Sequence, residues 1–113
     1  LKGKKHLILG NHDRSWLNKV EATDFFKSVE RYTEISDSKR KLALCHYPMM
    51  SWGGTGKGSY LIHGHIHNNR DAAYWPLLAS MDHALNASVE INHYQPVTFD
   101  QLVLNNDLFK RQV

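Results

Sequence analysis

Three short polar clusters carry the residues of this chain that could do chemistry. They are Gly10-Asn11-His12-Asp13, Cys45-His46-Tyr47-Pro48 and His63-Gly64-His65-Ile66-His67-Asn68. Each cluster follows a short apolar run that is typical of a β-strand. Imidazole, thiolate and carboxylate groups are common protein ligands of transition metals. The clusters therefore predict a metal site that is assembled from strand ends distant in the sequence.

Histidine is the residue type that dominates the clusters. The chain has eight histidines, and five of them lie in the clusters: His12, His46, His63, His65 and His67. Three histidines within five residues, behind a strand, favour metal binding over a structural role, whereas His46 alone would fit either. The other histidines, at positions 6, 83 and 93, are interpreted as structural or surface residues.

The first cluster allows two interpretations. Asn11 offers a neutral oxygen ligand, and His12 beside Asp13 has the composition of an imidazole that is held by a carboxylate. The same segment could instead begin a helix, with Asn11 or Asp13 as the N-cap. Both roles are compatible, because a helix start also favours a bound anion.

Hydrophobic patterning predicts the strands that must position the clusters. Short apolar strands are predicted at residues 4–9, 41–45 and 60–62, directly before the three clusters. A strand-like pattern from 25 to 35 and turn residues at 36–39 predict a hairpin with 41–45. The sheet is thus expected to present its polar clusters at strand ends.

Helices and one more strand are predicted around these elements. Trp16, Leu17 and Val20 recur at helical spacing, which indicates a short helix after the first cluster. Alternating residues within 84–94 predict a further strand that ends before Pro96. Thr98 and Gln101 fit a capping box for a helix near the C-terminus.

Residues 48–59 hold four glycines and are predicted to form a flexible loop. Gly56-Lys57 superficially resembles a phosphate-binding loop, but position 51 is serine and Gly58 stands where Ser or Thr is required. We therefore reject a nucleotide-triphosphatase function. Trp52 could form a rim over the site or pack in the core, and the sequence supports both equally.

Composition sets the general class of the protein. With 113 residues, 42% of them hydrophobic and 22% charged, the chain suits at most one soluble globular domain. No apolar run has the length of a membrane span or the layout of a signal peptide. The single cysteine allows no internal disulfide and favours a cytoplasmic location. The net charge of +3 favours ordinary solvated surface over a dedicated anionic partner.

Taken in this order, the three motifs resemble the calcineurin-like metallophosphoesterase family. The resemblance covers most of the chain and extends to the segment from Val89 to Val97, which is similar to the closing strand of small bacterial members. It implies an α/β fold, a β-sandwich flanked by helices in four layers (α/β/β/α). Residues 1–113 would be the C-terminal portion of one such domain, a partial sandwich that lacks the N-terminal strands.

The resemblance also implies two divalent metal ions and their ligands. Asn11, His46 and His65 match ligands of one metal, and His67 matches a ligand of the other. His63 is not a usual ligand and is interpreted as a residue that supports the ligands. Mn²⁺ is the favoured ion, with Fe, Ni²⁺, Co²⁺ and Zn²⁺ as alternatives, since mixed nitrogen and oxygen ligation suits them all.

The implied reaction is hydrolysis of a phosphomonoester or phosphodiester. Two cations would neutralise the phosphate and lower the pKa of a bridging water, whose hydroxide attacks phosphorus in line. His12 matches the histidine that contacts the phosphate and protonates the leaving group, and Asp13 matches its carboxylate partner. The substrate would be a small molecule or a nucleotide, with nucleic acid still among the candidates and no membrane involved.

The chain departs from the family pattern at its start. The family's Asp-x-His and Gly-Asp motifs, which supply three ligands including the bridging aspartate, do not occur in the sequence. We therefore expect the isolated chain to fold poorly or to bind one metal at most, which leaves its own activity an open question. Two alternatives remain: a non-catalytic interaction scaffold of the same fold, for which His12 would be unnecessary, and a histidine-based metal buffer, which leaves the first cluster unused.

Overall fold

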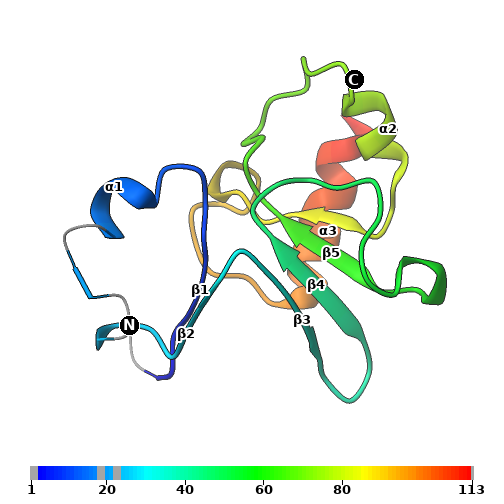
Figure 1. Ribbon diagram of the computed structural model, residues 1–113. Helices are drawn as coiled ribbons and strands as arrows, with labels where there is room; N and C mark the ends of the chain where they lie inside the picture. The colour runs from blue at the N-terminus through cyan, green and yellow to red at the C-terminus, as the bar shows by residue number, and fades with distance from the viewer. Residues whose placement is uncertain (1–2, 18–19, 22–23, 113) are drawn as a thin grey trace.

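The computed structural model describes residues 3–17, 20–21 and 24–112, which form a mixed α/β structure. Helices are interspersed among the strands along the chain (Figure 1). The strands are β1 (His6–Ile8), β2 (Ser28–Glu30), β3 (Tyr32–Ser36), β4 (Lys41–Cys45), β5 (Tyr60–His63) and β6 (Ala84–Asn86). The α-helices are α1 (Arg14–Leu17), α2 (Trp75–Ser80) and α3 (Phe99–Arg111), and the short 3₁₀ helices are η2 (Thr55–Lys57) and η3 (Val89–Ile91).

The strands form two sheets. β1 and β2 pair in parallel, and with α1 they make a small lobe beside the main sheet (Figure 1). The main sheet has the order β3-β4-β5-β6, in which β3 and β4 are antiparallel and β4, β5 and β6 are parallel. Parallel pairing brings the carboxyl ends of β4 and β5 to the same edge, so the second and third polar clusters leave the sheet side by side.

Most of the elements predicted from the sequence are confirmed. The strands before the three clusters form as β1, β4 and β5, and β3 pairs with β4 as the expected hairpin. Asp37 closes the hairpin turn by accepting hydrogen bonds from the backbone N–H groups of Lys39 and Arg40, at 2.8 and 2.7 Å. The capping box also forms, since Thr98 and Gln101 each accept a hydrogen bond from the other's backbone N–H.

The strand predicted within residues 84–94 is wrong beyond its first residues. β6 ends at Asn86, and the alternating stretch folds instead into η3, followed by His93 and Tyr94 with φ of 60° and 55°. The buried Asn92 side chain donates to the carbonyls of Asn86 and Ser88, at 3.1 and 2.8 Å. These bonds tie the segment into a compact turn, and a continuing strand would break them.

One face of the main sheet is buried in the core. Ala43, Leu61 and Ala84 are in register on this face and fully buried. They belong to a cluster that also contains Trp52, Ile66 and Leu78. Trp52 donates its indole N–H to the Ser59 carbonyl at 3.1 Å, so the core interpretation of this residue is the correct one.

The opposite face of the same strands is less covered. Leu42, Leu44 and Ile62 lie on this face, and each is only half-buried. Leu44 and Ile62 line a hollow at the end of the sheet together with Ile8. This uneven burial leaves apolar sheet surface exposed beside the strand ends that carry the clusters.

Helix α3 packs against β6 and fixes the end of the sheet. Its Asn106, almost fully buried, accepts a hydrogen bond from the Asn86 backbone N–H at 2.6 Å and donates to the Asn86 carbonyl at 3.0 Å. β6 is at the edge of the sheet, so the Asn86 backbone groups on its outer side have no neighbouring strand to pair with in the described part of the chain. The Asn106 side-chain amide bonds to these groups instead. At 13 residues α3 is the longest helix described, and none of the described helices meets the length and apolarity needed to cross a membrane.

Candidate metal centre

The second and third clusters meet because β4 and β5 are parallel neighbours. His46 follows the last residue of β4, and Gly64 follows the last residue of β5. The Gly64 backbone N–H donates to the His46 carbonyl at 2.8 Å. A Cβ atom on Gly10 would lie 3.2 Å from His46 Nδ1, and one on Gly64 would lie 3.5 Å from it. The glycines of the first and third clusters thus let their backbones approach the His46 ring.

Three donor atoms converge at this point, one from each cluster. His46 Nε2 lies 2.7 Å from Asn11 Oδ1 and 3.2 Å from His65 Nδ1. These are the residues that the sequence predicts as ligands of one metal. Among the described residues, no group of three His, Cys, Asp or Glu side chains could hold a metal ion. Asn11, the third residue at this point, is an amide.

The chemistry of this donor set suits a cation. His46 Nε2 faces an amide oxygen and another imidazole nitrogen, but a neutral ring carries at most one hydrogen there. A single hydrogen cannot serve both partners well. The three residues therefore fit a metal ion with nitrogen and oxygen ligands.

The two histidines of the Gly-His-x-His motif have strained backbones. His65 and His67 have φ of 71° and 51°, in the left-handed region that non-glycine residues seldom occupy. Such strain costs on the order of 1 kcal/mol per residue and persists only where the surroundings impose it. Both residues belong to the third cluster, and His93 and Tyr94, outside the clusters, have φ in the same region.

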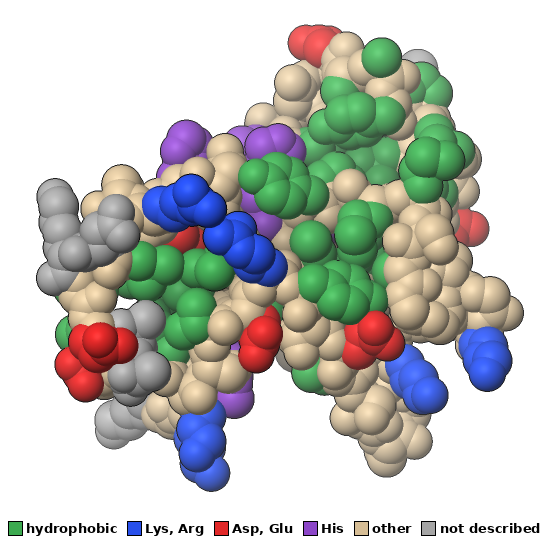
Figure 2. Space-filling view, viewed as in Figure 1, with side chains coloured by type: hydrophobic (Ala, Val, Ile, Leu, Met, Phe, Trp, Pro, Cys, Tyr) green, Lys and Arg blue, Asp and Glu red, His purple; other side chains and the backbone are tan. Residues whose placement is uncertain are grey.

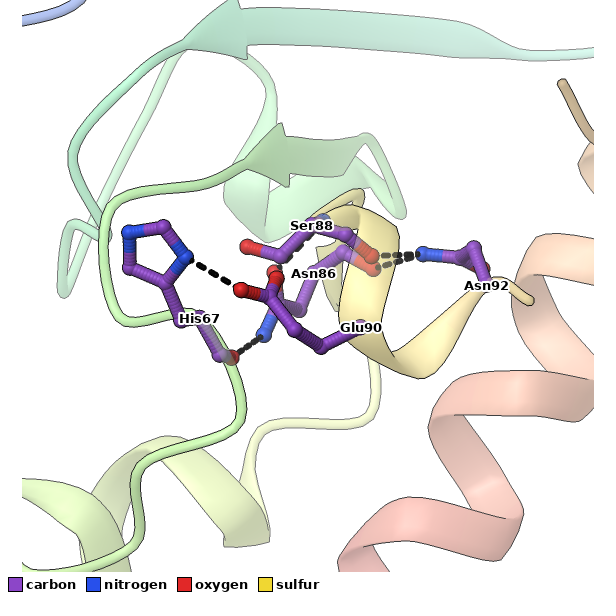
Figure 3. Close-up of polar contacts among 5 residues, drawn as sticks. All are labelled: His67, Asn86, Ser88, Glu90 and Asn92. Carbon is purple, nitrogen blue, oxygen red and sulfur yellow. Dashed lines mark hydrogen bonds and ion pairs between the residues drawn. The ribbon is translucent and has the colours of Figure 1, made fainter. Parts of the chain in front are cut away.

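His67 lines the same hollow as His46 and His65 and is held by Glu90. Its Nδ1 lies 2.7 Å from Glu90 Oε2 (Figure 3), and both residues line a hollow of about 470 Å³ with His46 and His65. The contact leaves Nε2 of the largely exposed His67 ring free. A carboxylate on one ring nitrogen fixes the tautomer that presents the other nitrogen to a metal.

A buried amide holds the loop that carries His67. Asn86 donates from Nδ2 to the His67 carbonyl at 2.8 Å and accepts at Oδ1 from the Ser88 backbone N–H at 2.9 Å (Figure 3). Asn86 is itself held by Asn106 of α3. A continuous set of hydrogen bonds therefore connects α3, β6 and the His67 loop.

The first cluster is organised differently from the expected pairing of His12 with Asp13. The Asp13 carboxylate accepts hydrogen bonds from the Gly10 backbone N–H at 2.6 Å and from the Trp16 indole N–H at 2.7 Å. In the part of the chain that the structure describes, no hydrogen bond joins His12 to Asp13. Asp13 directly precedes α1, so its carboxylate stabilises the turn that carries Asn11 and His12 rather than the His12 ring.

Burial shifts the protonation of two histidines at the centre. The pKa of His46 is lowered chiefly by burial and then by the neighbouring His65. Burial also lowers the pKa of His63 to about 4. Only 3% of His63 is exposed, and its Nδ1 lies 3.0 Å from the Gly64 carbonyl. Both rings are therefore neutral near pH 7, and His63 lies buried in the third cluster.

Sequence reasoning missed Glu90 and Asn86. Glu90 is an isolated carboxylate in a segment that was predicted to be a strand, and Asn86 is one of several asparagines. Glu90 Oε1 is also buried and has no hydrogen-bond partner among the described residues. The sequence carried no signal for either residue, because their roles depend on η3 turning Glu90 back toward His67.

Comparison with known proteins supports the fold but names no activity. No protein-family model matches the chain. The chain is 32% identical over 103 residues to the uncharacterized protein MJ1445 of Methanocaldococcus jannaschii, covering 91% of this chain and 50% of that protein. It thus spans about half the length of the curated relative that it matches.

A solved structure shares the fold. It is the crystal structure of the protein of unknown function AQ665 from Aquifex aeolicus, with a TM-score of 0.58 and 27% sequence identity. The match covers 86% of this chain and 58% of that one. The mixed α/β architecture is therefore shared with a protein of larger size.

Proposed function

We propose that this chain belongs to a metal-dependent phosphoester hydrolase of the calcineurin-like metallophosphoesterase type. The observation that carries the proposal is the convergence of Asn11 Oδ1, His46 Nε2 and His65 Nδ1, with separations of 2.7 and 3.2 Å. Each atom comes from a different motif, and the motif order is that of the family. A histidine-based metal buffer would have no need for the Asn11 amide in this position.

Different residues of the chain would bind the metal ions and donate the proton to the leaving group. When bound, divalent cations, with Mn²⁺ favoured, neutralise a phosphoester and make water a nucleophile near neutral pH. Asn11, His46 and His65 would hold one cation, and His67, oriented by Glu90, would contribute to the other. Neutral imidazoles are needed for this, and the lowered pKa of His46 favours its neutral form.

His12 is the proposed proton donor to the leaving group. It follows Asn11 directly and is exposed to solvent, so its ring is accessible to a bound phosphoester. Asp13 would support this role by fixing the turn through Gly10 and Trp16. An imidazolium at this place can protonate the departing alkoxide, which is otherwise a poor leaving group.

We also propose that the main sheet is one half of the four-layer sandwich of that family. The half-buried Leu42, Leu44 and Ile62 face away from the core, as expected of a sheet face that a second sheet covers. The relatives are longer than this chain, with 50% and 58% of their lengths matched.

The test is hydrolysis of bis(4-nitrophenyl) phosphate and 4-nitrophenyl phosphate by the full-length protein with Mn²⁺. We expect His46→Ala to abolish activity by loss of metal, measured in parallel by metal analysis. His12→Ala should retain the metal and lose about 100-fold in kcat, the usual contribution of a positioned general acid.

His83→Ala is the matched control, since His83 stacks on Tyr60 at 4.0 Å outside the centre. It should keep full activity. An inactive wild-type protein with its metals bound would contradict the proposal and favour the scaffold alternative. Equal rates for wild type and His12→Ala would remove the general-acid role alone.

A further inference from the structure

An apolar hollow of about 410 Å³ lies directly beside the candidate metal centre. Its lining consists of Tyr47, Pro48, Met49, Met50, His65, Tyr74, Leu77, Leu78 and Met81. Apart from His65, the described lining contains no His, Lys, Arg, Asp or Glu side chain. A volume of this size suits one small-molecule group rather than a protein segment.

The hollow is continuous with the metal centre through two side chains. His65 contributes Nδ1 to the converging donors and also lines the hollow. The Tyr47 ring packs against the His65 and His46 rings, with centroids 4.7 and 5.0 Å away. A phosphoryl group at the centre would therefore place its ester substituent within reach of the hollow.

The apolar residues at the rim are unusually open to solvent. Met50 is 75% exposed, and Leu77 and Tyr74 are each 46% exposed. Figure 2 shows hydrophobic side chains gathered next to the histidines on one face of the molecule. An apolar ligand that covers such a surface removes apolar area from water, and this burial stabilises the complex.

A second hollow beside Tyr47 has a mixed character. A hollow of about 490 Å³ that Tyr47 also lines contains Arg14 and Arg31 together with Asn11, the carboxylate of Asp13 and the apolar Leu9 and Leu17. Guanidinium groups suit phosphate oxygens. Tyr47 thus lines both the apolar hollow and a mixed hollow that contains two guanidinium groups.

We propose that the substrate is a phosphoester with an apolar, aromatic or branched alkyl substituent, which binds in the hollow formed by Tyr47, Met50, Tyr74 and Leu77. The proposal rests on the proposed phosphoester hydrolysis. The phosphoryl group would lie at Asn11, His46 and His65. Polar esters such as glycerol phosphate would leave the apolar hollow in water and gain nothing from it.

The experiment compares phenyl and 4-tert-butylphenyl phosphates, as monoesters and as methyl diesters, with the full-length protein and Mn²⁺. The two aryl groups leave with similar ease, so the ratio of their kcat/KM values reports apolar binding. We expect the 4-tert-butylphenyl ester to be favoured by about tenfold, the effect of burying a few methyl groups.

Leu77→Gln should reduce that ratio to about threefold or less, because a polar side chain then lines the hollow. Leu104→Gln is the matched control: Leu104 is 57% exposed on α3 and lines none of the hollows described here. It should leave the ratio unchanged. Both residues are exposed, so neither variant is expected to unfold the protein.

A binding measurement separates the hollow from catalysis. 4-tert-Butylbenzylphosphonate, which is not hydrolysed, should bind more tightly than methylphosphonate in calorimetry, with a negative heat-capacity change that Leu77→Gln diminishes. This preference should persist after metal removal, because it arises from the apolar hollow.

The outcomes distinguish the two proposals. If no ester is hydrolysed but the phosphonate preference is seen, the hollow binds apolar groups as proposed, and the proposed hydrolase function is wrong. If both esters react equally in wild type and Leu77→Gln, the apolar-substituent proposal is wrong although hydrolysis is real. A large loss of melting temperature in Leu77→Gln but not in Leu104→Gln would show that another part of the protein fills the hollow, and would also overturn the proposal.

Discussion

At the scale of single residues, Glu90 has the most specific consequence. Its contact with His67 at 2.7 Å is the sort of carboxylate–histidine pair that raises the affinity of a metal ligand. The pKa of Glu90 is lowered by its own backbone N–H and by His67, so the carboxylate is ionised near neutral pH. Glu90 therefore orients the His67 ring.

Glu90→Gln is expected to weaken metal binding by about 10- to 100-fold, because the amide orients and polarises His67 less well. The measurement is competition with a fluorescent chelator, using the full-length protein. Asp107→Asn is the control, since Asp107 pairs with Arg111 at 2.9 Å on the surface of α3. Unchanged affinity in Glu90→Gln would show that the pair is only structural.

His63 predicts a pH dependence of stability. The pKa of this ring falls from 6.5 to about 4 on burial, so the unfolded chain binds a proton that the folded chain does not between these values. Stability is then lost as pH falls from about 6.5 to about 4, by roughly 3 kcal/mol in total.

The comparison uses urea unfolding of metal-free protein in chelator. Between pH 7 and pH 4, wild type should lose about 3 kcal/mol more than His63→Gln, whose side chain does not titrate. His83→Gln, which removes a more exposed histidine bonded to the Gly58 carbonyl, should follow wild type. Parallel curves for wild type and His63→Gln would rule out the lowered pKa.

At the scale of elements, the link between α3 and β6 decides where the His67 loop lies. Asn106 is 1% exposed and makes three hydrogen bonds, two to the Asn86 backbone and one to the Leu102 carbonyl. Asn106→Ala leaves the buried Asn86 backbone N–H without its partner, and the Asn86 carbonyl keeps only the bond from Asn92. We expect a loss of about 2–3 kcal/mol in the free energy of unfolding.

Asn105→Ala is the neighbouring control. Asn105 is half-buried and donates to Asn92 Oδ1 at 3.1 Å, so the loss should stay below about 1 kcal/mol. Urea denaturation of both variants provides the comparison. Equal losses in the two variants would mean that the Asn106 bonds do not hold the helix on the sheet.

The elements also show which patterns in the sequence were reliable. The hairpin of β3 and β4 follows from local signals, a turn anchored by Asp37 between two extended runs. The segment after β6 has an equally regular alternation, but η3 forms there. Buried hydrogen bonds from Asn92 outweigh the weak strand preference of this stretch, and these bonds depend on residues brought together by the fold.

At the scale of the whole molecule, the two proposed metal positions differ in how many candidate ligands surround them. Three donor atoms converge around His46, whereas His67 has only Glu90 beside it among the described contacts. The isolated 113-residue chain should therefore retain at most one Mn²⁺ or Zn²⁺ per molecule after dialysis, measured by elemental analysis. His46→Ala should reduce this to none. Two tightly retained ions in the isolated chain would contradict the expectation.

The sequence by itself determined the motifs, their order and most of the strands that carry them. Local patterns suffice for this, because strand and turn preferences depend on neighbouring residues. Only the tertiary structure decided that Asn11, His46 and His65 meet, that Asp13 bonds Gly10 and Trp16 instead of His12, and that Glu90 reaches His67. These contacts join residues through parallel strand pairing, turns and packing, whose geometry no short stretch of sequence contains.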